Sequence, residues 1–451
     1  MKILKAIAVA FTLATATSVE ALGQSLIRDT EIEQVLREYT DPILVAAGLL
    51  PADVDLYLVA DPTLNAFVTG GQNIFLHTGI IVEAGTPNQL KGVIAHETGH
   101  IAGAHLARSG DAMQAAAVPV YVSMGLGLLA ALAGEGGAGA TLMASSQQFG
   151  ALSFLTYSRG QEASADQAAL GYLEETGQSG QGLVEFFDRF RYQEVMSNAR
   201  RFPYFRSHPL SSHRIDALRE NVEQSEFFTV QDSPEDIAYL RRIQAKIYGF
   251  LVEPEFVFYR YPETDQSLPA RYARAVAYYH DARLDEAREE IESLIAEEPE
   301  NPYFHELYGQ MLFESGRAEE SIQYHARSVE LLPTAPLLRV NLAISQIATE
   351  DPQLLEDARR NLRIALDIEP DNAFAWYQLS IVHERSGETA LAQLAVAEQA
   401  FAVGNSGRAR QFAMRARANL EQGTPAWFRA TEIEAVSIPT REEIRRQRRR
   451  N

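Results

Sequence analysis

Two histidines and one glutamate in this chain have the types and spacing that bind a metal ion and activate water. His96, Glu97 and His100 form a His-Glu-x-x-His motif inside the stretch 91–105. On a helix, residues four apart project from one face, so both imidazoles could bind one zinc ion at about 2.0–2.1 Å. Glu97 would lie beside them and could take a proton from the attacking water. Surface histidines that bind nothing are the alternative, and the apolar residues on both sides of the motif argue against it.

A second helical segment could complete the set of ligands. Glu162 and Asp166 are four residues apart in an alanine-rich stretch that follows Ser158, so both carboxylates share one helix face. Glu162 could be the third zinc ligand, and Asp166 could accept a hydrogen bond from the other ring nitrogen of a ligating histidine. Asp166 as the metal ligand is the alternative assignment. The other interpretation is that both carboxylates are solvated on an exposed helix face, and it would be preferred only if the histidine motif were absent.

Further candidate groups follow in the segment 206–216, which we interpret as a Pro- and Ser-containing loop. His208 or His213 could reach the zinc as a fourth ligand or donate a hydrogen bond to a reaction oxyanion, and both could equally be surface residues. Arg214 could hold the loop or bind a peptide carbonyl. Local spacing does not decide between these roles.

Length and composition indicate a large exported protein. A chain of 451 residues is too long to fold around one ordinary hydrophobic core, so we expect two or three domains. The formal net charge of −20 argues against nucleic acid as the main partner. Lys2 and Lys5 precede an apolar stretch and small residues around Ala21, and this pattern predicts a signal peptide at 1–21. A membrane anchor is the alternative, and the apolar run is too short for it. Together with the absence of cysteine, this pattern fits a bacterial periplasm.

The elements that would position the motif predict a mixed domain over 25–225. Helical periodicity covers 25–50, a strand pattern covers 54–59, and residues 65–79 alternate as two strands around a Gly-Gly turn. Residues 115–157 are mostly apolar or small. They predict a helical hairpin that packs over the site or makes peripheral contact with a membrane, and we favour this over a transmembrane segment because proline and glycine interrupt the run.

After a mixed linker at 226–266, an internal repeat predicts an α-helical solenoid over 267–421. Small residues and helix-ending residues both recur at gaps of 34, 37 and 34 residues. The small residues are Ala287, Ser321, Ala358 and Ala392, and the helix ends are Pro299, Pro333, Pro370 and Gly404. Tyr278, Tyr308, Gly309, Trp376 and Leu379 add consensus positions of the tetratricopeptide repeat. About four stacked helix pairs would form a surface for protein segments, and a bundle with no binding role is the alternative.

The last segment, 422–451, ends in an arginine-rich stretch on an acidic protein. Pairing with the protein's own acidic surface is the favoured interpretation, and binding to anionic lipid or to a partner is the alternative.

These motifs together resemble a known family of metallopeptidases. His96-Glu97-x-x-His100 followed by Glu162-x-x-x-Asp166 resembles the gluzincin arrangement. Further positions are similar to the HtpX-like and CAAX-prenyl-endopeptidase family, namely Asn65-Ala66-Phe67, Gly70-Gly71, His105 and Ser207-His208-Pro209. With a signal peptide and repeats, the chain resembles the periplasmic β-barrel assembly-enhancing protease type of that family. The competing metzincin pattern needs a histidine where this chain has Leu106.

The resemblance implies roles for the metal site. His96, His100 and Glu162 would bind one zinc ion per chain, and Glu97 would be the general base. His208 matches a family position that can cap the zinc or assist catalysis.

The resemblance also implies how substrate is held. Asn65, Ala66 and Phe67 would lie on an edge strand that pairs with an extended substrate. His105 is a feature of the family and not a ligand.

We therefore predict an α+β fold, mainly α: a zincin-type metallopeptidase domain with a small β-sheet, followed by the tetratricopeptide-repeat solenoid. The predicted function is a zinc-dependent endopeptidase of the periplasm that hydrolyses unfolded or misassembled proteins. Its repeats would select clients or dock on outer-membrane assembly machinery, as the resemblance implies. The alternative is a repeat-based chaperone or adaptor whose peptidase site is silenced because His208 occupies the open coordination position.

Overall fold

The computed structural model describes residues 26–69, 71–105, 158–196, 208 and 212–438, with the backbone alone for 190–196. The chain divides into two compact units with a boundary between Val252 and Glu253, which we call the N-terminal and the C-terminal unit. The predicted signal peptide, the apolar segment 115–157 and the arginine-rich end lie outside the described residues. Among the residues that are described, no helix combines the length and the hydropathy that crossing a membrane requires.

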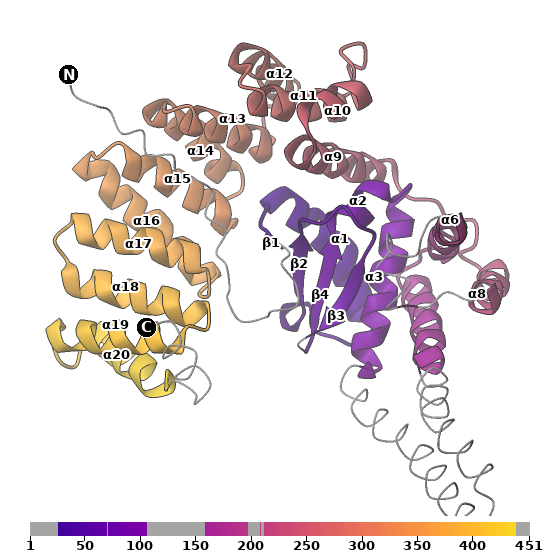
Figure 1. Ribbon diagram of the computed structural model, residues 1–451, viewed down its shortest axis with the longest axis horizontal. Helices are drawn as coiled ribbons and strands as arrows, with labels where there is room; N and C mark the ends of the chain where they lie inside the picture. The colour runs from indigo at the N-terminus through magenta and orange to yellow at the C-terminus, as the bar shows by residue number, and fades with distance from the viewer. Residues whose placement is uncertain (1–25, 70, 106–157, 197–207, 209–211, 439–451) are drawn as a thin grey trace, which may run out of the picture. The chain divides into compact units, whose positions relative to one another are not determined.

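A four-stranded sheet forms the centre of the N-terminal unit (Figure 1). Its order is β1 (Leu26–Ile27), β2 (Asp55–Val59), β4 (Asn73–His77) and β3 (Ala66–Thr69). β2 and β4 are parallel, and the other two pairs are antiparallel. The prediction of two strands in 65–79 is confirmed, and Gly71 in the turn has a φ of 109°, which glycine adopts without strain.

Helices pack around this sheet. They are α1 (Thr30–Ala46), α2 (Thr78–Glu83), α3 (Pro87–Ala102), a helix at 158–175, α6 (Gln181–Met196), α8 (Ser212–Gln224) and α9 (Pro234–Leu251), with a short 3₁₀ turn at Pro51–Asp53. The Thr86 side chain caps α3 by accepting a hydrogen bond from the backbone N–H of Gln89, and Pro87 begins the helix. Because α3 contacts α1, α6, α9 and β3, it is buried along most of its length. Its small and apolar residues suit this central position.

Residues 234–251, which were expected within a linker, form helix α9 and pack on α1, α2 and α3. Lys91 Nζ lies 2.9 Å from an Asp236 carboxylate oxygen. Gln244 donates hydrogen bonds of 2.8 Å to the carbonyls of Ile81 and Ala84. The N-terminal unit therefore extends beyond residue 225, and α9 makes polar contacts with α3 and with the end of α2.

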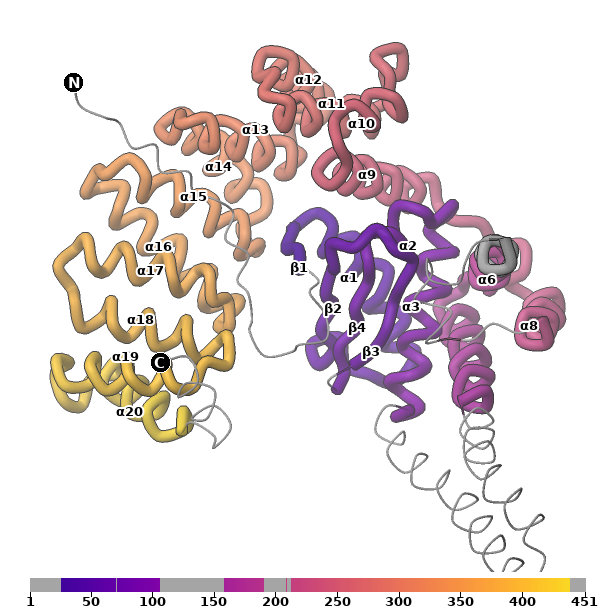
Figure 2. The backbone as a smooth tube through the Cα atoms, viewed as in Figure 1, coloured from indigo at the N-terminus to yellow at the C-terminus, as the bar shows by residue number. Residues whose placement is uncertain are grey.

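The C-terminal unit is a succession of paired helices, as Figure 2 shows. They are α10 (Pro254–Arg260), α11 (Leu268–His280), α12 (Leu284–Glu297), α13 (Pro302–Glu314), α14 (Ala318–Leu331), α15 (Pro336–Ala348), α16 (Pro352–Ile368), α17 (Ala373–Arg385), α18 (Thr389–Ala402), α19 (Ser406–Asn419) and α20 (Pro425–Val436). The predicted helical repeat is confirmed. α19 and α20 add a pair beyond the four predicted units, so part of the predicted tail is a packed helix with a buried Ile433.

Small residues set how closely each helix pair packs. Ala287, Ser321 and Ala358 are completely buried. A Cβ on Gly309 would lie 2.8 Å from the ring of His325, so that the imidazole of α14 rests on the backbone of α13. Burial of this ring lowers the pKa of His325 to about 4.

The stability of the C-terminal unit should therefore fall between pH 6.5 and about 4. Above pH 6.5 the His325 ring is neutral in the folded and unfolded states. As the pH falls, the unfolded chain takes up a proton that the folded unit accepts only near pH 4. The free energy of unfolding should decrease by up to about 3 kcal/mol across this window and level off below it.

Tryptophan fluorescence during urea unfolding can measure this effect in the full chain, because both tryptophans, Trp376 and Trp427, lie in the C-terminal unit. A His325→Leu variant removes the titrating group. The difference between the two proteins isolates His325 from other histidines, and an equal pH dependence in both would contradict the assignment.

Candidate metal centre

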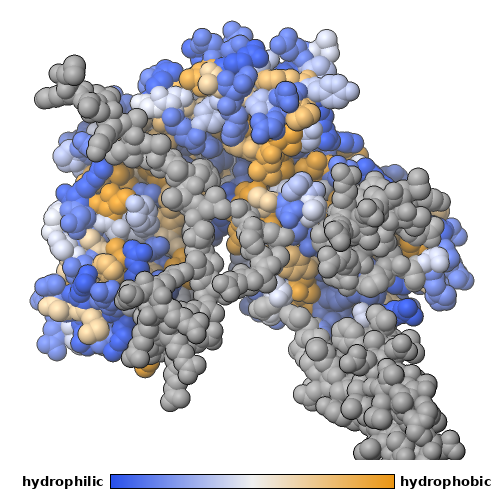
Figure 3. Space-filling model, viewed as in Figure 1, coloured by the Kyte–Doolittle hydropathy of each residue, from blue (hydrophilic) through white to orange (hydrophobic). Residues whose placement is uncertain are grey.

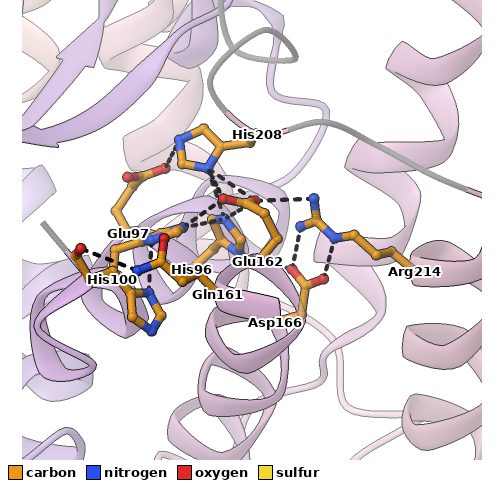
Figure 4. A network of polar contacts seen from close by, with 9 residues as sticks. His96, Glu97, His100, Gln161, Glu162, Asp166, His208 and Arg214 are labelled. Carbon is orange, nitrogen blue, oxygen red and sulfur yellow. Dashed lines mark hydrogen bonds and ion pairs between the residues drawn. The ribbon is translucent and has the colours of Figure 1, made fainter. Parts of the chain in front are cut away.

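Four buried side chains from three segments converge on one point (Figure 4). His96 and His100 extend from α3, Glu162 comes from the helix at 158–175, and His208 comes from the segment before α8. One ligand atom from each residue lies within 4.8 Å of the others. The structure thus brings together residues that are far apart in the sequence.

The spacing of these atoms fits a tetrahedral metal ion. His96 Nε2 lies 3.1 Å from His100 Nε2 and 3.2 Å from His208 Nδ1. Glu162 oxygens lie 3.4 Å from each of the first two nitrogens and 3.2 Å from the third. Four ligands at about 2.0–2.1 Å from a zinc ion would be roughly 3.3–3.4 Å apart. Since His96 Nε2 can carry at most one proton, hydrogen bonds alone do not account for its three close neighbours.

Asp166 and Arg214 contact the candidate ligands and orient them. His96 Nδ1 lies 2.9 Å from an Asp166 oxygen, which fixes the tautomer whose Nε2 is free to bind metal. Arg214 donates to both oxygens of Asp166, at 2.7 and 2.8 Å, and its third nitrogen lies 3.1 Å from a Glu162 oxygen. This planar, bidentate contact orients the carboxylates.

The segment around Arg214 differs from the predicted loop. α8 begins at Ser212, because Ile215, Leu218 and Val222 recur at helical spacing and are buried. Within α8, Arg214 is buried and His213 is exposed. His208 is therefore the histidine of this segment that reaches the cluster.

The electrostatics of the cluster favour a bound cation. Burial lowers the pKa of His96, but hydrogen bonds to Asp166 and Glu162 outweigh it and raise the pKa to about 10. Burial would raise the pKa of Asp166, yet its contacts with His96 and Arg214 hold that pKa below the ordinary value. The carboxylates therefore stay ionised and present negative charge to the site.

Glu97 lies next to the cluster and has unused acceptor capacity. Its Oε1 is 3.4 Å from His208 Nε2, and the side chain is fully buried. Within the described part of the chain, neither carboxylate oxygen accepts a hydrogen bond. Burial raises the pKa of this carboxyl group. A buried carboxylate of raised pKa beside a metal-binding cluster can accept a proton from water.

Residues 27–222 match the family model described as peptidase family M48. These residues form an M48 peptidase domain. The match spans both the histidine motif and the segment of Glu162 and His208, so the family assignment covers the whole cluster.

Curated relatives extend the similarity into the repeats. The β-barrel assembly-enhancing protease of Escherichia coli strain K12 is 26% identical over 335 residues, which cover 73% of this chain and 67% of that protein. Metalloprotease LoiP of the same organism is 27% identical over 175 residues, covering 38% of this chain and 63% of that protein. The protein is thus a metalloendopeptidase, which acts on protein or peptide substrates.

A solved structure, that of MamA, is also similar to this chain. It shows 18% identity, covers 39% of this chain and 96% of its own, and has a TM-score of 0.30. Because this score is low, the repeat architecture described above rests on the helix pairs themselves.

Two residues beside the four candidate ligands were not assigned roles from the sequence. His105 Nδ1 lies 3.0 Å from His100 Nδ1, and Gln161 donates a hydrogen bond of 3.2 Å to the His105 carbonyl. His105 is therefore a contact of a candidate ligand, as Asp166 is for His96. The sequence signal that could have pointed to Gln161 is its position directly before Glu162.

Asn65, Ala66 and Phe67 lie where β3 begins, and β3 contacts α3. The Asn65 carbonyl accepts a hydrogen bond from the His77 backbone, and its side-chain nitrogen lies 3.4 Å from His77 Nε2. These contacts hold the start of β3 against the end of β4.

Close packing of two helices sets the position of Glu162. A Cβ on Gly99 would lie 2.9 Å from the Ala165 carbonyl oxygen and 3.0 Å from its Cα. Glycine at 99 therefore allows α3 to approach the helix at 158–175 at this point. Glu162 and Asp166 flank Ala165 and reach the histidines of α3 as a result.

A Gly99→Ala variant should separate these helices and lower the free energy of unfolding by about 1–3 kcal/mol. It should also weaken zinc binding at least tenfold, which is the usual effect of losing a residue that orients a metal ligand. Hydrogen exchange of α3 amides and competition with a chromophoric chelator measure the two effects. Gly171→Ala, in open space on the same helix as Glu162, is the matched control. It should bind zinc normally, and equal losses in both variants would refute the packing argument.

Proposed function

We propose that this protein is a zinc-dependent endopeptidase of the periplasm that cuts unfolded or misassembled outer-membrane proteins. The observation that carries this proposal is the buried group of His96, His100, Glu162 and His208 with Glu97 beside it. The predicted signal peptide and the absence of cysteine support the compartment. The name of the similar β-barrel assembly-enhancing protease supports the class of client.

His96, His100 and Glu162 would hold the zinc ion. A zinc ion bound there would polarise the scissile carbonyl and acidify water. Glu97 takes the proton of the attacking water and passes it to the leaving amine. Asp166 keeps His96 in its ligating tautomer, and we propose that Arg214 positions both carboxylates in place of the predicted contact with substrate.

A second candidate function is a repeat-based chaperone or adaptor with a closed peptidase site. The observation that favours it is the position of His208, whose Nδ1 lies 3.2 Å from His96 Nε2 and from both Glu162 oxygens. Catalytic zinc sites keep one position open for water or substrate. A fourth protein ligand would fill that position until His208 moves away.

The repeats of the C-terminal unit would bind clients or the outer-membrane assembly machinery. Its visible face in Figure 3 alternates between hydrophilic and hydrophobic patches. On α17, Phe374 and Tyr377 are about half exposed, and their rings stack at 6.5 Å. Exposed aromatic side chains of this kind are enriched where proteins bind one another.

Metal removal tests the proposal. Dialysis against a chelator should abolish cleavage of denatured casein, and one equivalent of zinc should restore it, whereas magnesium should not, because nitrogen ligands select zinc. Cleavage that survives complete removal of metal would refute the peptidase mechanism. A protein that binds one zinc ion and never cuts would favour the chaperone function.

A further inference from the structure

Three aromatic rings form a row across one face of the sheet in the M48 domain. Tyr57 on β2 is paired with Phe75 on β4, and Phe75 is paired with Phe67 on β3. The ring centroids of Phe67 and Phe75 are 5.0 Å apart with an interplanar angle of 3°. Those of Tyr57 and Phe75 are 4.8 Å apart at 17°. All three side chains are partly exposed.

The row ends at a strand that has an open edge. Among the described strands, β3 pairs with β4 alone and is last in the sheet order. The His77 N–H donates to the Asn65 carbonyl at 3.0 Å, so the alternation of an antiparallel ladder makes the pair of Phe67 and Phe75 hydrogen-bonded as well. The N–H and C=O groups of Ala66 and Val68 consequently point away from β4, as a template for another strand.

The ring of Phe67 stacks on Phe75 of β4, so its opposite face lies on the side away from β4. Phe75 stacks on one face, and the ring of His77 makes a T-shaped contact with Phe67 at a centroid distance of 6.0 Å and an interplanar angle of 78°. Neighbouring strands lie about 4.7–4.9 Å apart, which matches the ring spacing in the row. A strand added to β3 would therefore place one side chain at stacking distance from Phe67.

We propose that the M48 domain selects extended substrates with an aromatic residue opposite Phe67. This inference rests on the proposed function. An antiparallel substrate would pair its backbone with Ala66 and Val68, and its residue between those pairs would face Phe67 in a non-hydrogen-bonded pair, where side chains approach most closely. Because β3 lies beside α3 (Figure 1), such a chain would run along the active-site helix. The substrate ring would continue the row by one strand.

Cleavage-site mapping tests this specificity. The full-length protein would digest denatured casein, and mass spectrometry would locate the cut bonds. Wild type should show Phe, Tyr or Trp enriched at one fixed offset from the scissile bond. Peptides that carry Phe or Leu at that offset should differ roughly two- to tenfold in kcat/KM, and the comparison with Leu separates ring stacking from hydrophobicity.

Two variants of Phe67 and one control locate the preference in the row. Phe67→Ala and Phe67→Leu should both bring the ratio of Phe to Leu peptides close to one, and Phe67→Leu does so with little loss of packing volume. Tyr57→Ala, at the far end of the row, should keep the ratio. The same ratios should appear in dissociation constants of labelled peptides for a Glu97→Gln protein, which reports binding without turnover.

Each failure has a separate meaning. Metal-dependent cleavage without a fixed-offset aromatic preference, or a preference that persists in both Phe67 variants, would overturn this inference and leave the proposed function intact. The absence of any metal-dependent cleavage would overturn both. A preference that disappears only in the Phe67 variants would establish Phe67 as a specificity-determining residue.

Discussion

Replacement of Glu97 by glutamine should reduce casein cleavage by about 10²- to 10⁴-fold, the usual contribution of a general base, without loss of zinc. The amide keeps the shape of the side chain but cannot accept the proton of the attacking water. Because Glu97 is outside the four candidate ligands, zinc content should stay near one ion per chain. Zinc analysis and casein assays on the same preparations measure both quantities.

Protein stability provides a second measurement for the same variant. Glu97 is fully buried and, within the described residues, neither oxygen accepts a hydrogen bond. Loss of its charge should therefore leave the melting temperature unchanged or raise it, because burial of a carboxylate that accepts no hydrogen bond is costly. Glu174→Gln, on the exposed face of the helix that carries Glu162, is the matched control and should cut at the wild-type rate. Wild-type activity of Glu97→Gln would eliminate Glu97 as the base.

Replacement of His208 by alanine should increase cleavage, by about tenfold if the His208 ligand stabilises the closed site by about 1.4 kcal/mol. In the structure its Nδ1 takes the fourth place around His96, His100 and Glu162. Removal of the ring opens that place for water and substrate. Three ligands remain, so zinc content should be unchanged.

His213→Ala is the matched control for this variant, since His213 lies five residues further on and is exposed on α8. It should leave both cleavage and zinc content at wild-type values. A sharp loss of cleavage in His208→Ala would instead make His208 a catalytic residue that stabilises the oxyanion, which was the competing role in the sequence analysis. Titration of casein against each variant distinguishes a change in kcat from a change in KM.

Local periodicity explains why the metal motif could be found without a structure. His96 and His100 are four residues apart on one helix, so their common direction follows from the helical repeat alone. The same holds for the helical solenoid, where each unit repeats the small residues that let two helices pack. The strands of 65–79 were equally visible because alternation and a Gly-Gly turn are local signals.

The neighbours of the motif required the tertiary structure. His208 and His213 were equivalent candidates in a predicted loop, yet α8 begins between them. Arg214 follows His213 by one residue, and a step of one residue turns a helix by about 100°. The exposed histidine and the buried arginine therefore face opposite environments, which the interpretation as a loop could not show.

The sequence by itself indicated the class of chemistry and the two histidines and the glutamate of α3, since these depend on spacing within one helix. It also indicated the repeat architecture, which depends on a pattern that recurs along the chain. The tertiary structure placed His208 in the cluster, Arg214 against the carboxylates of Glu162 and Asp166, and α9 in the N-terminal unit. His208 meets His96 across 112 residues of chain. Such a contact depends on how closely whole helices pack, as at Gly99, and packing distance is a property of two surfaces together.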